Sequence, residues 1–211
     1  MQEFDWIWEP SSVMFKPRRF VHDPVFGKPI HQYAAPHWEF ELTLPPTDME
    51  TRRDICSFFG ETEGVAIVNV YDPRVPVPAI YHKFRHDELL TKRIPDLIIK
   101  SVSKENRTVT VNGAVGDKIS KDDPVAFTHE DVRHYYRSLR DLTLDGSDQE
   151  LLVDLRPRKT LTDLNITLTA ESRIKPTCRF QININDHGGL TNSDGFTDYV
   201  LSGVEFHGPI S

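Results

Sequence analysis

The sequence predicts a mainly β fold, a split β-barrel or sandwich with one flanking helix and a second short helix. Two observations support this fold class. Apolar and polar residues alternate in many short segments, and 15 prolines and 11 glycines interrupt the chain at short intervals. A period of two is typical of a strand with one buried face, and frequent breakers favour short strands over long helices. We therefore expect one β-rich domain over residues 1–211, with a weak seam near residue 124.

The clearest strand signal is Trp38–Leu44, in which every second residue is apolar. The run Val65–Tyr71 is almost entirely apolar and β-branched, which predicts a strand buried on both faces. Alternation predicts further strands at residues 4–8, 98–102, 108–111, 151–155, 164–168, 178–184 and 197–206. About ten short strands at this spacing are typical of a barrel or a sandwich.

A flanking helix is predicted after Pro45-Pro46. Thr47–Glu50 has the pattern of a capping box, in which the first and fourth side chains satisfy backbone N–H groups of the first turn. Ile55, Phe58 and Phe59 would share one helix face, and Gly60 would end the helix.

The second, shorter helix is predicted at Glu130–Leu139, with Thr128 as its cap. This helix would place four large side chains on one side: Val132, Tyr135, Tyr136 and Leu139. The seam near residue 124 is the change of composition that leads into this helix.

Three turns are predicted between strands. Lys104–Arg107 would join two strands as a hairpin, and Asp145–Asp148 would form another hairpin turn. Gly113–Asp117 is too short to wrap a phosphate, so it too is interpreted as a turn.

The net charge of −7 comes from 32 acidic and 25 basic residues, without any long basic run. A large phosphate-binding surface would need clustered positive charge, so nucleic-acid binding is not expected. Cys56 and Cys178 lie far apart and are interpreted as buried free thiols. The acidic, aromatic N-terminus lacks the pattern of a signal peptide, and no apolar stretch is long enough to cross a membrane. We expect the protein to be made and kept in the cytoplasm until assembly.

Histidines provide the main metal candidates. His82 and His86 are four residues apart, which suits two ligands on a helix, and Asp87 lies beside them. The same segment alternates polar and aromatic residues and equally fits a strand with solvated histidines. His129 and His134 resemble a zinc-protease signature, but five-residue spacing turns them to different helix faces, so that hypothesis is rejected.

No other segment carries a clear catalytic or ligand-binding motif. The loop 185–195 is rich in Asn, Asp and Gly; it either holds calcium or is a turn-rich surface loop, and it lacks the register of an EF-hand. Trp6, Trp8 and Trp38 could stack on a sugar, although alternation favours a place in the core. We find no nucleophile elbow or phosphate loop. The sequence therefore predicts no enzyme, no catalytic residue, no bound metal and no cofactor.

The order of several features resembles a known class of proteins. A strand that starts with a tryptophan runs into a Pro-Pro pair and a short helix, then a Tyr-Asp-Pro strand end, a proline-rich turn and two later strand segments. The segments that carry the resemblance are Trp38–Leu44, Pro45-Pro46, Phe58–Gly60, Tyr71–Pro73, Val75–Pro78, Asn112–Val125, Leu151–Arg158 and Arg179-Phe180. Over residues 36–182 this order resembles tail proteins of tailed bacteriophages, of the distal-tail and baseplate-tube type.

The resemblance implies a structural virion protein with a split β-barrel and a flanking helix, which forms a six-fold ring around the tail lumen. The implied partners are copies of itself, the neighbouring tail tube and baseplate hub proteins, and DNA only as passing cargo. The implied location is the virion tail, after the host cytoplasm. The resemblance implies no catalytic residue in this chain. The alternative is a carbohydrate-binding β-sandwich of a receptor-binding apparatus.

Two segments are candidates for contacts within such a ring. Val13–Pro29 and Ala79–Pro95 are both rich in Pro, Arg, Lys and His and also carry aromatic residues. Arms of this composition are common in interfaces between subunits.

Overall fold

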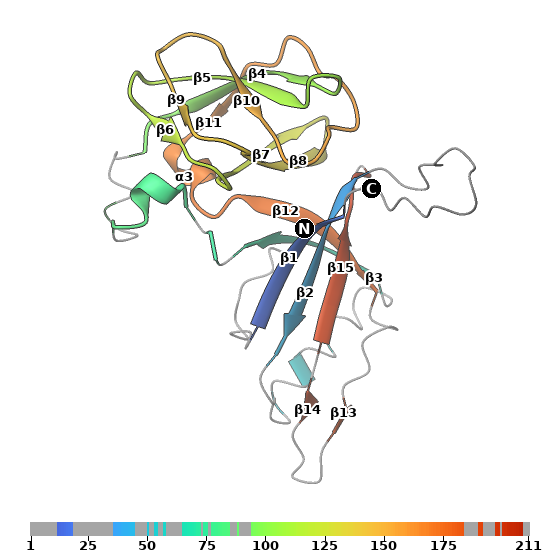
Figure 1. Cartoon of the computed structure of the whole chain (residues 1–211). Helices are drawn as coiled ribbons and strands as arrows, with labels where there is room; N and C mark the ends of the chain where they lie inside the picture. The colour runs from blue at the N-terminus through green and yellow to red at the C-terminus, as the bar shows by residue number, and fades with distance from the viewer. Residues whose placement is uncertain are drawn as a thin grey trace, which may run out of the picture. The chain divides into compact units, whose positions relative to one another are not determined.

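A computed structural model describes residues 12–18, 36–44, 50, 53–54, 57, 65–72, 74–75, 77–84, 88, 94–183, 190–191, 197–198 and 200–208. The chain divides into two compact units (Figure 1). Unit 1 comprises Met1–Lys16, Trp38–Val70 and Cys178–Gly208; unit 2 comprises Pro17–His37, Tyr71–Thr177 and Pro209–Ser211. Strands dominate the described residues, so the predicted mainly β fold is confirmed. The single domain stays a prediction; residue 124 lies inside unit 2.

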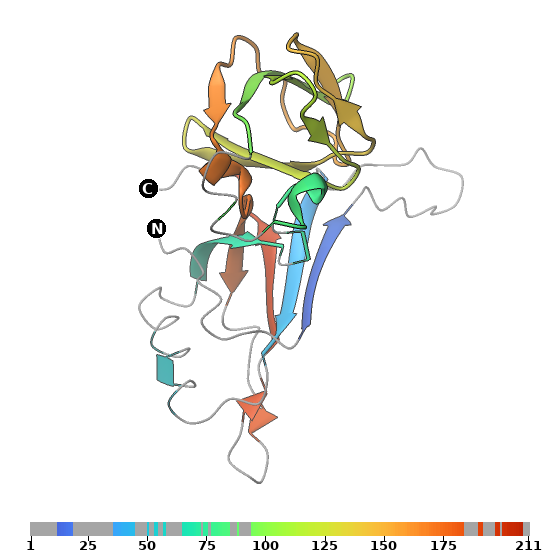
Figure 2. The same cartoon turned by 90° about the vertical axis from the view of Figure 1, so that its left-hand side faces the viewer.

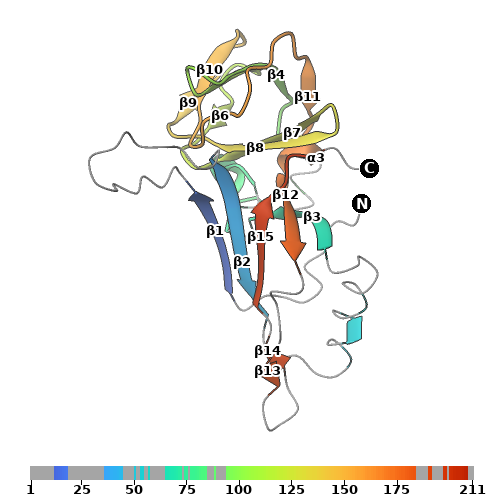
Figure 3. The same cartoon turned by 90° about the vertical axis from the view of Figure 1, so that its right-hand side faces the viewer.

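Unit 1 is built on a five-stranded sheet of order β1-β2-β15-β12-β3 (Figure 3). The strands are β1 (Ser12–Arg18), β2 (His37–Thr43), β3 (Val65–Tyr71), β12 (Thr177–Asn183) and β15 (Val200–Glu205). β15 pairs antiparallel with both β2 and β12. A short antiparallel pair, β13 (Leu190–Thr191) and β14 (Thr197–Asp198), precedes β15. The sheet therefore brings together segments from both ends of the chain.

The core of unit 1 is aromatic. Trp38, Phe40 and Leu42 on β2 are buried, as the alternation predicts, and Glu41 between them is exposed. Phe15, Phe40 and Phe180 form a cluster in which the rings of Phe40 and Phe180 lie 4.7 Å apart, edge to face. Phe15 adds a second edge contact to Phe180 at 5.4 Å. Aromatic pairs in such geometry stabilise a core beyond their buried area.

Gly203 on β15 makes room for this cluster. It pairs across the strands with Phe40 and, on the other side, with Ile182. A Cβ atom at this position would overlap the ring of Phe40 and would lie 3.1 Å from the carbonyl oxygen of Gln181. The position therefore requires glycine for reasons of space.

The strand predicted at Val65–Tyr71 is confirmed as β3, with the same limits. Its predicted burial on both faces is wrong. Ala66, Val68 and Val70 are buried, whereas the alternate residues are only half-buried. β3 ends the strand order of its sheet, so an apolar run here packs one face against a core and leaves the other partly open to solvent.

Unit 2 contains a four-stranded antiparallel sheet of order β10-β5-β4-β11. Its strands are β4 (Leu97–Ser103), β5 (Thr108–Gly113), β10 (Gln149–Leu152) and β11 (Ile166–Leu168). Two antiparallel pairs accompany it: β6 (Lys118–Ile119) with β9 (Leu142–Thr143), and β7 (Pro124–His129) with β8 (Val132–Arg137). The short helices η1 (Ala79–Tyr81) and α3 (Ala170–Arg173) lie below these strands in the view of Figure 2; η1 contacts β6, and α3 contacts β7. None of the sheets in the described residues closes into a barrel.

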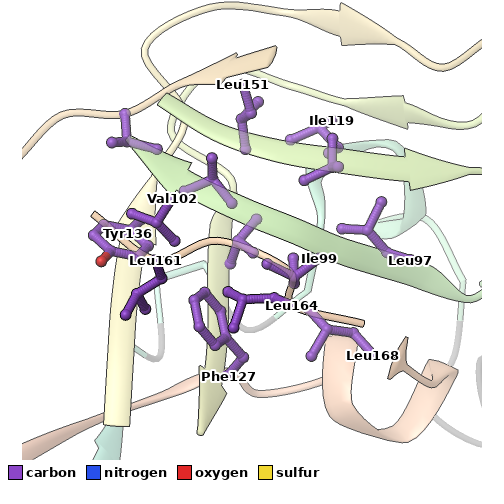
Figure 4. Close-up of a cluster of buried hydrophobic side chains, with 14 of the residues drawn as sticks. Leu97, Ile99, Val102, Ile119, Phe127, Tyr136, Leu151, Leu161, Leu164 and Leu168 are labelled. Carbon is purple, nitrogen blue, oxygen red and sulfur yellow. The ribbon is translucent and has the colours of Figure 1, made fainter. Parts of the chain in front are cut away.

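The larger of two apolar clusters in unit 2 forms its main core (Figure 4). It takes residues from every strand pair of the unit: Leu97, Ile99, Val102, Val109, Val111, Ile119, Val125, Phe127, Tyr136, Leu144, Leu151, Val153, Leu161, Leu164 and Leu168. The predicted alternations at 151–155 and 164–168 supply several of them.

The second predicted helix, Glu130–Leu139, is wrong. Val132–Arg137 is strand β8, which pairs residue by residue with β7. Glu130 and Asp131 form the turn between them with φ angles of 49° and 61°. Two successive positive φ angles are the geometry of a tight hairpin turn, and a helix cannot pass through them. The composition change near residue 124 marks the start of this hairpin.

Part of the first predicted helix is described. Glu50, Arg53, Asp54 and Ser57 are helical and exposed, in agreement with that prediction. The apolar face of this segment lies outside the described residues. Sequence reasoning missed α3, whose N-cap Thr169 accepts a hydrogen bond from the Ser172 amide.

The predicted turns are confirmed with one correction. Lys104–Arg107 joins β4 to β5 as a hairpin. Gly113–Asp117 is a turn in which the Asp117 amide donates to the Ala114 carbonyl at 3.1 Å and Gly116 has a φ of 85°. Asp145–Asp148 is also a turn, but it does not close a hairpin, because β9 pairs with β6 and β10 with β5.

Candidate functional site

Of the histidine pair weighed as metal ligands, His82 and His86, the structure describes His82. This residue is exposed, lies in the turn that follows η1, and its Nε2 is 2.8 Å from the Val77 carbonyl oxygen. His86 and Asp87 lie outside the described residues. Neither the helix nor the strand considered for this segment forms at His82, which belongs to a turn. Among the residues that the structure describes, no group of three or more His, Cys, Asp or Glu side chains is arranged to hold a metal ion.

The other sequence candidates are placed only in part. His134 is buried on β8 and stacks on Phe127 at 4.9 Å, so it belongs to the core. His129 lies 3.8 Å from the carboxylate of the neighbouring Glu130. Of the loop 185–195, the structure describes Leu190–Thr191, so the calcium hypothesis falls outside it.

The predicted core positions are confirmed where they are described. Cys178 is a buried free thiol, and Trp38 is 1% exposed. Cys56, Trp6 and Trp8 lie outside the described residues. No helix in the described part of the chain is long and apolar enough to cross a bilayer.

The most charged part of the interior is a set of three buried aspartates in unit 2. The first, Asp117, accepts hydrogen bonds from Tyr81 Oη and Arg173 Nη1, each at 2.7 Å. Arg173 also donates to the Pro95 carbonyl at 2.6 Å, and both charged side chains are at least 96% buried. Burial, then the hydrogen bond to Asp117, raises the pKa of Tyr81. This network ties η1, α3 and the start of β6 together.

The second aspartate, Asp123, is 1% exposed and binds two backbone amides. It accepts from Ala79 N at 2.8 Å and from Ser120 N at 2.7 Å. Burial raises the pKa of this carboxyl, although both amides and the positive charge of Arg173 favour the ionised form. Asp123 thus holds the start of η1 against the turn before β7.

A small depression adjoins Asp123 and Arg173. Its walls are mostly apolar, with Pro78, Leu97 and Ala126 among them. It has room for about one water molecule. Because the polar groups in its wall already bind protein groups, the depression has the character of a packing gap.

The third aspartate, Asp72, has a fully buried carboxylate and binds two arginines. Arg74 Nε and Nη2 donate to its two oxygens at 2.9 and 2.7 Å, and Arg137 Nη2 donates to Oδ2. Burial opposes ionisation of Asp72, but the hydrogen bonds from Arg74 and the charge of Arg137 prevail and lower its pKa. Asp72 is the second residue of Tyr71–Thr177, the longest of the three segments that make up unit 2; it is called the long segment below.

The last residue of the same segment, Thr177, is also held by an arginine of β8. Arg133 Nε donates to the Thr177 carbonyl at 3.0 Å, and its Nη2 donates to Thr177 Oγ1 at 3.1 Å. Nearby, Lys175 Nζ lies 5.2 Å from the centre of the Tyr71 ring. A cation at this distance is attracted to the face of the ring.

Sequence reasoning missed all three aspartates and their arginines. A usable signal existed on β8, where Arg133, Tyr135 and Arg137 occupy every second position and would share a strand face. The incorrect helix prediction for this segment hid that alternation.

In unit 1 two valines are exposed on one face of the sheet. Val200 and Val204 on β15 are 47% and 49% exposed, with Ser202 between them. The residues opposite on β2 are Thr43, Glu41 and Glu39. A neighbouring surface that covered both valines would remove their apolar area from water.

The charge of the chain is divided very unevenly between the units. Unit 1 has 4 Lys and Arg against 14 Asp and Glu, a formal charge of −10. Unit 2 has 21 against 18, a formal charge of +3, which accounts for the −7 of the whole chain. The acidic character of the protein is therefore a property of unit 1.

Comparison with known proteins does not identify this chain. No protein-family model matches it, and no curated protein gives a significant match.

Proposed function

We propose that this chain is a structural subunit of a bacteriophage tail that assembles with copies of itself into a ring around the tail lumen. The observation that carries the proposal is the formal charge of −10 on unit 1. A passage for DNA must not bind phosphate, and like charges repel it. Unit 1 is therefore the part that would line the lumen, with DNA as passing cargo.

The sheet of unit 1 also suits assembly. Its strand order begins at β1 and ends at β3, so it is open at both ends within the described residues. A head-to-tail interface that closes by rotation gives a ring of identical subunits, with a hexamer expected here. The exposed Val200 and Val204 would lose water contact when a neighbour covers them.

The two ends of this sheet differ in their side chains. β1 carries Lys16, Pro17 and Arg18, and charged residues and proline are typical of strands protected against unwanted pairing. β3 is apolar apart from Asn69 and has no such protection. We therefore expect a neighbouring subunit to approach the β3 side. Of the two predicted contact arms, residues 13–18 belong to β1 and residues 79–81 to η1.

The buried aspartates support a structural role. Each binds arginines or backbone amides within unit 2, so its carboxylate oxygens already have protein partners. The prediction that the chain is not an enzyme is kept as part of the proposal. Neighbouring tube and hub proteins are the further partners, and the virion tail, after the host cytoplasm, is the proposed location.

The carbohydrate-binding alternative needs an aromatic side chain that a sugar can reach. Among the described residues, those exposed and both large and apolar are valines, and Trp38 is in the core. No described contact favours this alternative, so it stays a prediction from the sequence.

The proposal is tested first by the mass of the full-length protein in solution. Light scattering over a wide range of concentrations, with negative-stain imaging, should detect a closed ring. Replacing both exposed valines, V200D/V204D, should lower the ring fraction while the far-ultraviolet circular dichroism stays the same. The matched control K16D/R18D changes charge on β1 and should disturb assembly less. A monomer at every concentration, also in the presence of purified tail tube, would contradict the proposal.

The second test addresses the lumen. At low ionic strength, where electrostatic attraction to DNA is greatest, the assembled protein should not bind duplex DNA in a filter or mobility assay. A charge-reversed variant of unit 1, E50K/D54K, which changes two exposed acidic residues outside the sheet, should bind measurably and lose binding as salt rises. Tight binding by the unmodified protein would count against a lumen lined by unit 1.

A further inference from the structure

The long segment of unit 2 starts and ends at neighbouring strands of unit 1. β3 leads into it at Tyr71, and β12 leads out of it at Thr177. β3 and β12 lie next to each other in the strand order of the five-stranded sheet. Neighbouring strands are about 4.8 Å apart. Here residues 72–176 make the connection between these two neighbours.

The two ends of this segment meet within unit 2. Lys175 Nζ lies 5.2 Å from the centre of the Tyr71 ring, although the two residues are far apart in sequence. Domains that are inserted into another fold have ends that lie close together. The contact between Lys175 and Tyr71 meets that requirement.

One strand holds both ends. Arg137 of β8 donates to the buried Asp72 at the entry, and Arg133 of β8 donates to both oxygens of Thr177 at the exit. Residues four apart on a strand share a face and lie about 13 Å apart. The opposite face of β8 turns His134 and Tyr136 into the interior of unit 2. The arginines are thus fixed by a strand that is itself anchored in the unit.

The entry contact is stronger than an ordinary surface ion pair. The Asp72 carboxylate is 0% exposed and the Arg137 side chain 13% exposed, and Arg74 adds two further hydrogen bonds. Charge-assisted hydrogen bonds of this kind are about twice as strong as neutral ones. Arg74 N and Val75 N also bond back to Asp72, which closes a turn directly after the entry.

We propose that residues 71–177 are a module inserted between β3 and β12, and that Arg133 and Arg137 latch its exit and entry segments to β8. The latch makes both connections part of unit 2. Without it, each connection becomes a hinge. This inference does not depend on the role in a phage tail, since it rests only on contacts inside unit 2.

Hydrogen exchange of the full-length protein, resolved by mass spectrometry into short peptides, tests the latch. In R137A, amides in 73–77 should exchange about tenfold faster or more, because a charge-assisted bond is lost. In R133A, the increase should appear in 174–179 instead. Each single variant is the control for the other segment, and R140A, which changes an exposed arginine just after β8, should alter neither.

Three results would overturn the inference. The first is unchanged exchange at both segments in folded R133A/R137A. The second is faster exchange spread evenly over β4 and β5, which would mean that the arginines stabilise the whole unit. The third is an effect of R133A on the entry segment equal to its effect on the exit. If the double variant does not fold, the pattern of the two single variants decides. Trypsin cleavage after Arg74 in R137A, and its absence in R133A and R140A, is then an independent measure of the entry.

Discussion

The two units of this protein are stabilised by different physical means. Unit 1 carries a large negative charge, and its core is a cluster of aromatic rings on one face of an open sheet. Unit 2 is nearly neutral overall and carries aspartate–arginine pairs beside its apolar core. The comparison teaches that steric fit between aromatic rings limits what unit 1 tolerates, whereas unit 2 adds desolvated aspartate–arginine pairs to a large apolar core. Four predictions sharpen this contrast.

The largest effect is expected from R173A in unit 2. The change leaves the Asp117 carboxylate buried without its cation. Removal of one partner of a buried ion pair costs about 3–5 kcal/mol of the free energy of unfolding. Urea unfolding followed by tyrosine fluorescence measures it. The double variant R173M/D117N should recover part of the loss, and an equal or larger loss in the double variant would show that the pair itself is not the cause.

The next effect concerns steric fit in unit 1. G203A places a methyl group against the ring of Phe40, and overpacking of this kind costs about 1–3 kcal/mol. Thermal unfolding of G203A should show this loss. The matched double variant G203A/F40L should be more stable than the sum of the two single changes predicts, because the smaller side chain leaves room. Simple additivity would mean that the clash is relieved elsewhere.

A smaller, stabilising effect is expected at the hairpin turn of unit 2. Asp131 has a φ of 61°, a conformation that glycine adopts without strain. D131G should raise the free energy of unfolding by about 1 kcal/mol, since the second position of such a turn prefers glycine. The control D96G, at an exposed residue with ordinary backbone angles, should lower stability slightly. A loss in D131G would mean that contacts of the Asp131 side chain outweigh the backbone strain.

The smallest effect depends on pH and separates two aspartates of unit 2. Burial raises the pKa of Asp123 above 3.8, so its contribution to stability is full below that pH and falls as pH rises through the raised value. Asp72 has a lowered pKa, so its contribution is present above 3.8 and is lost only as pH falls. The free energy of unfolding of the unmodified protein minus that of D123N should therefore decrease from acidic to neutral pH. The same difference measured for D72N should grow over that range, and parallel curves would contradict both assignments.

Particular elements show where sequence reasoning succeeded. The alternation of Trp38, Phe40 and Leu42 has one structural solution, a strand with a single buried face, and β2 has that form. The turn at Lys104–Arg107 was predictable because its residues favour tight turns and both flanking segments alternate.

The failures have an equally local cause. Val132, Tyr135 and Tyr136 fit one side of a helix and also fit both faces of a strand that is buried on each side. Pairing with β7 selects the strand over the helix. That pairing requires positive φ angles at Glu130 and Asp131, and the residue types at these two positions do not indicate such angles. The buried aspartates were missed for a related reason, because a carboxylate that binds an arginine 65 positions away looks like a surface residue in the sequence.

The sequence by itself determined the mainly β character, the positions of the strongest strands and the total charge, because periodicity and charge are local properties of the chain. The tertiary structure decided that the acidic charge belongs to one unit, that β3 and β12 are neighbours, and that β8 holds both ends of the long inserted segment. These features arise from contacts between distant residues, whose free energy depends on the folded arrangement and leaves no local pattern.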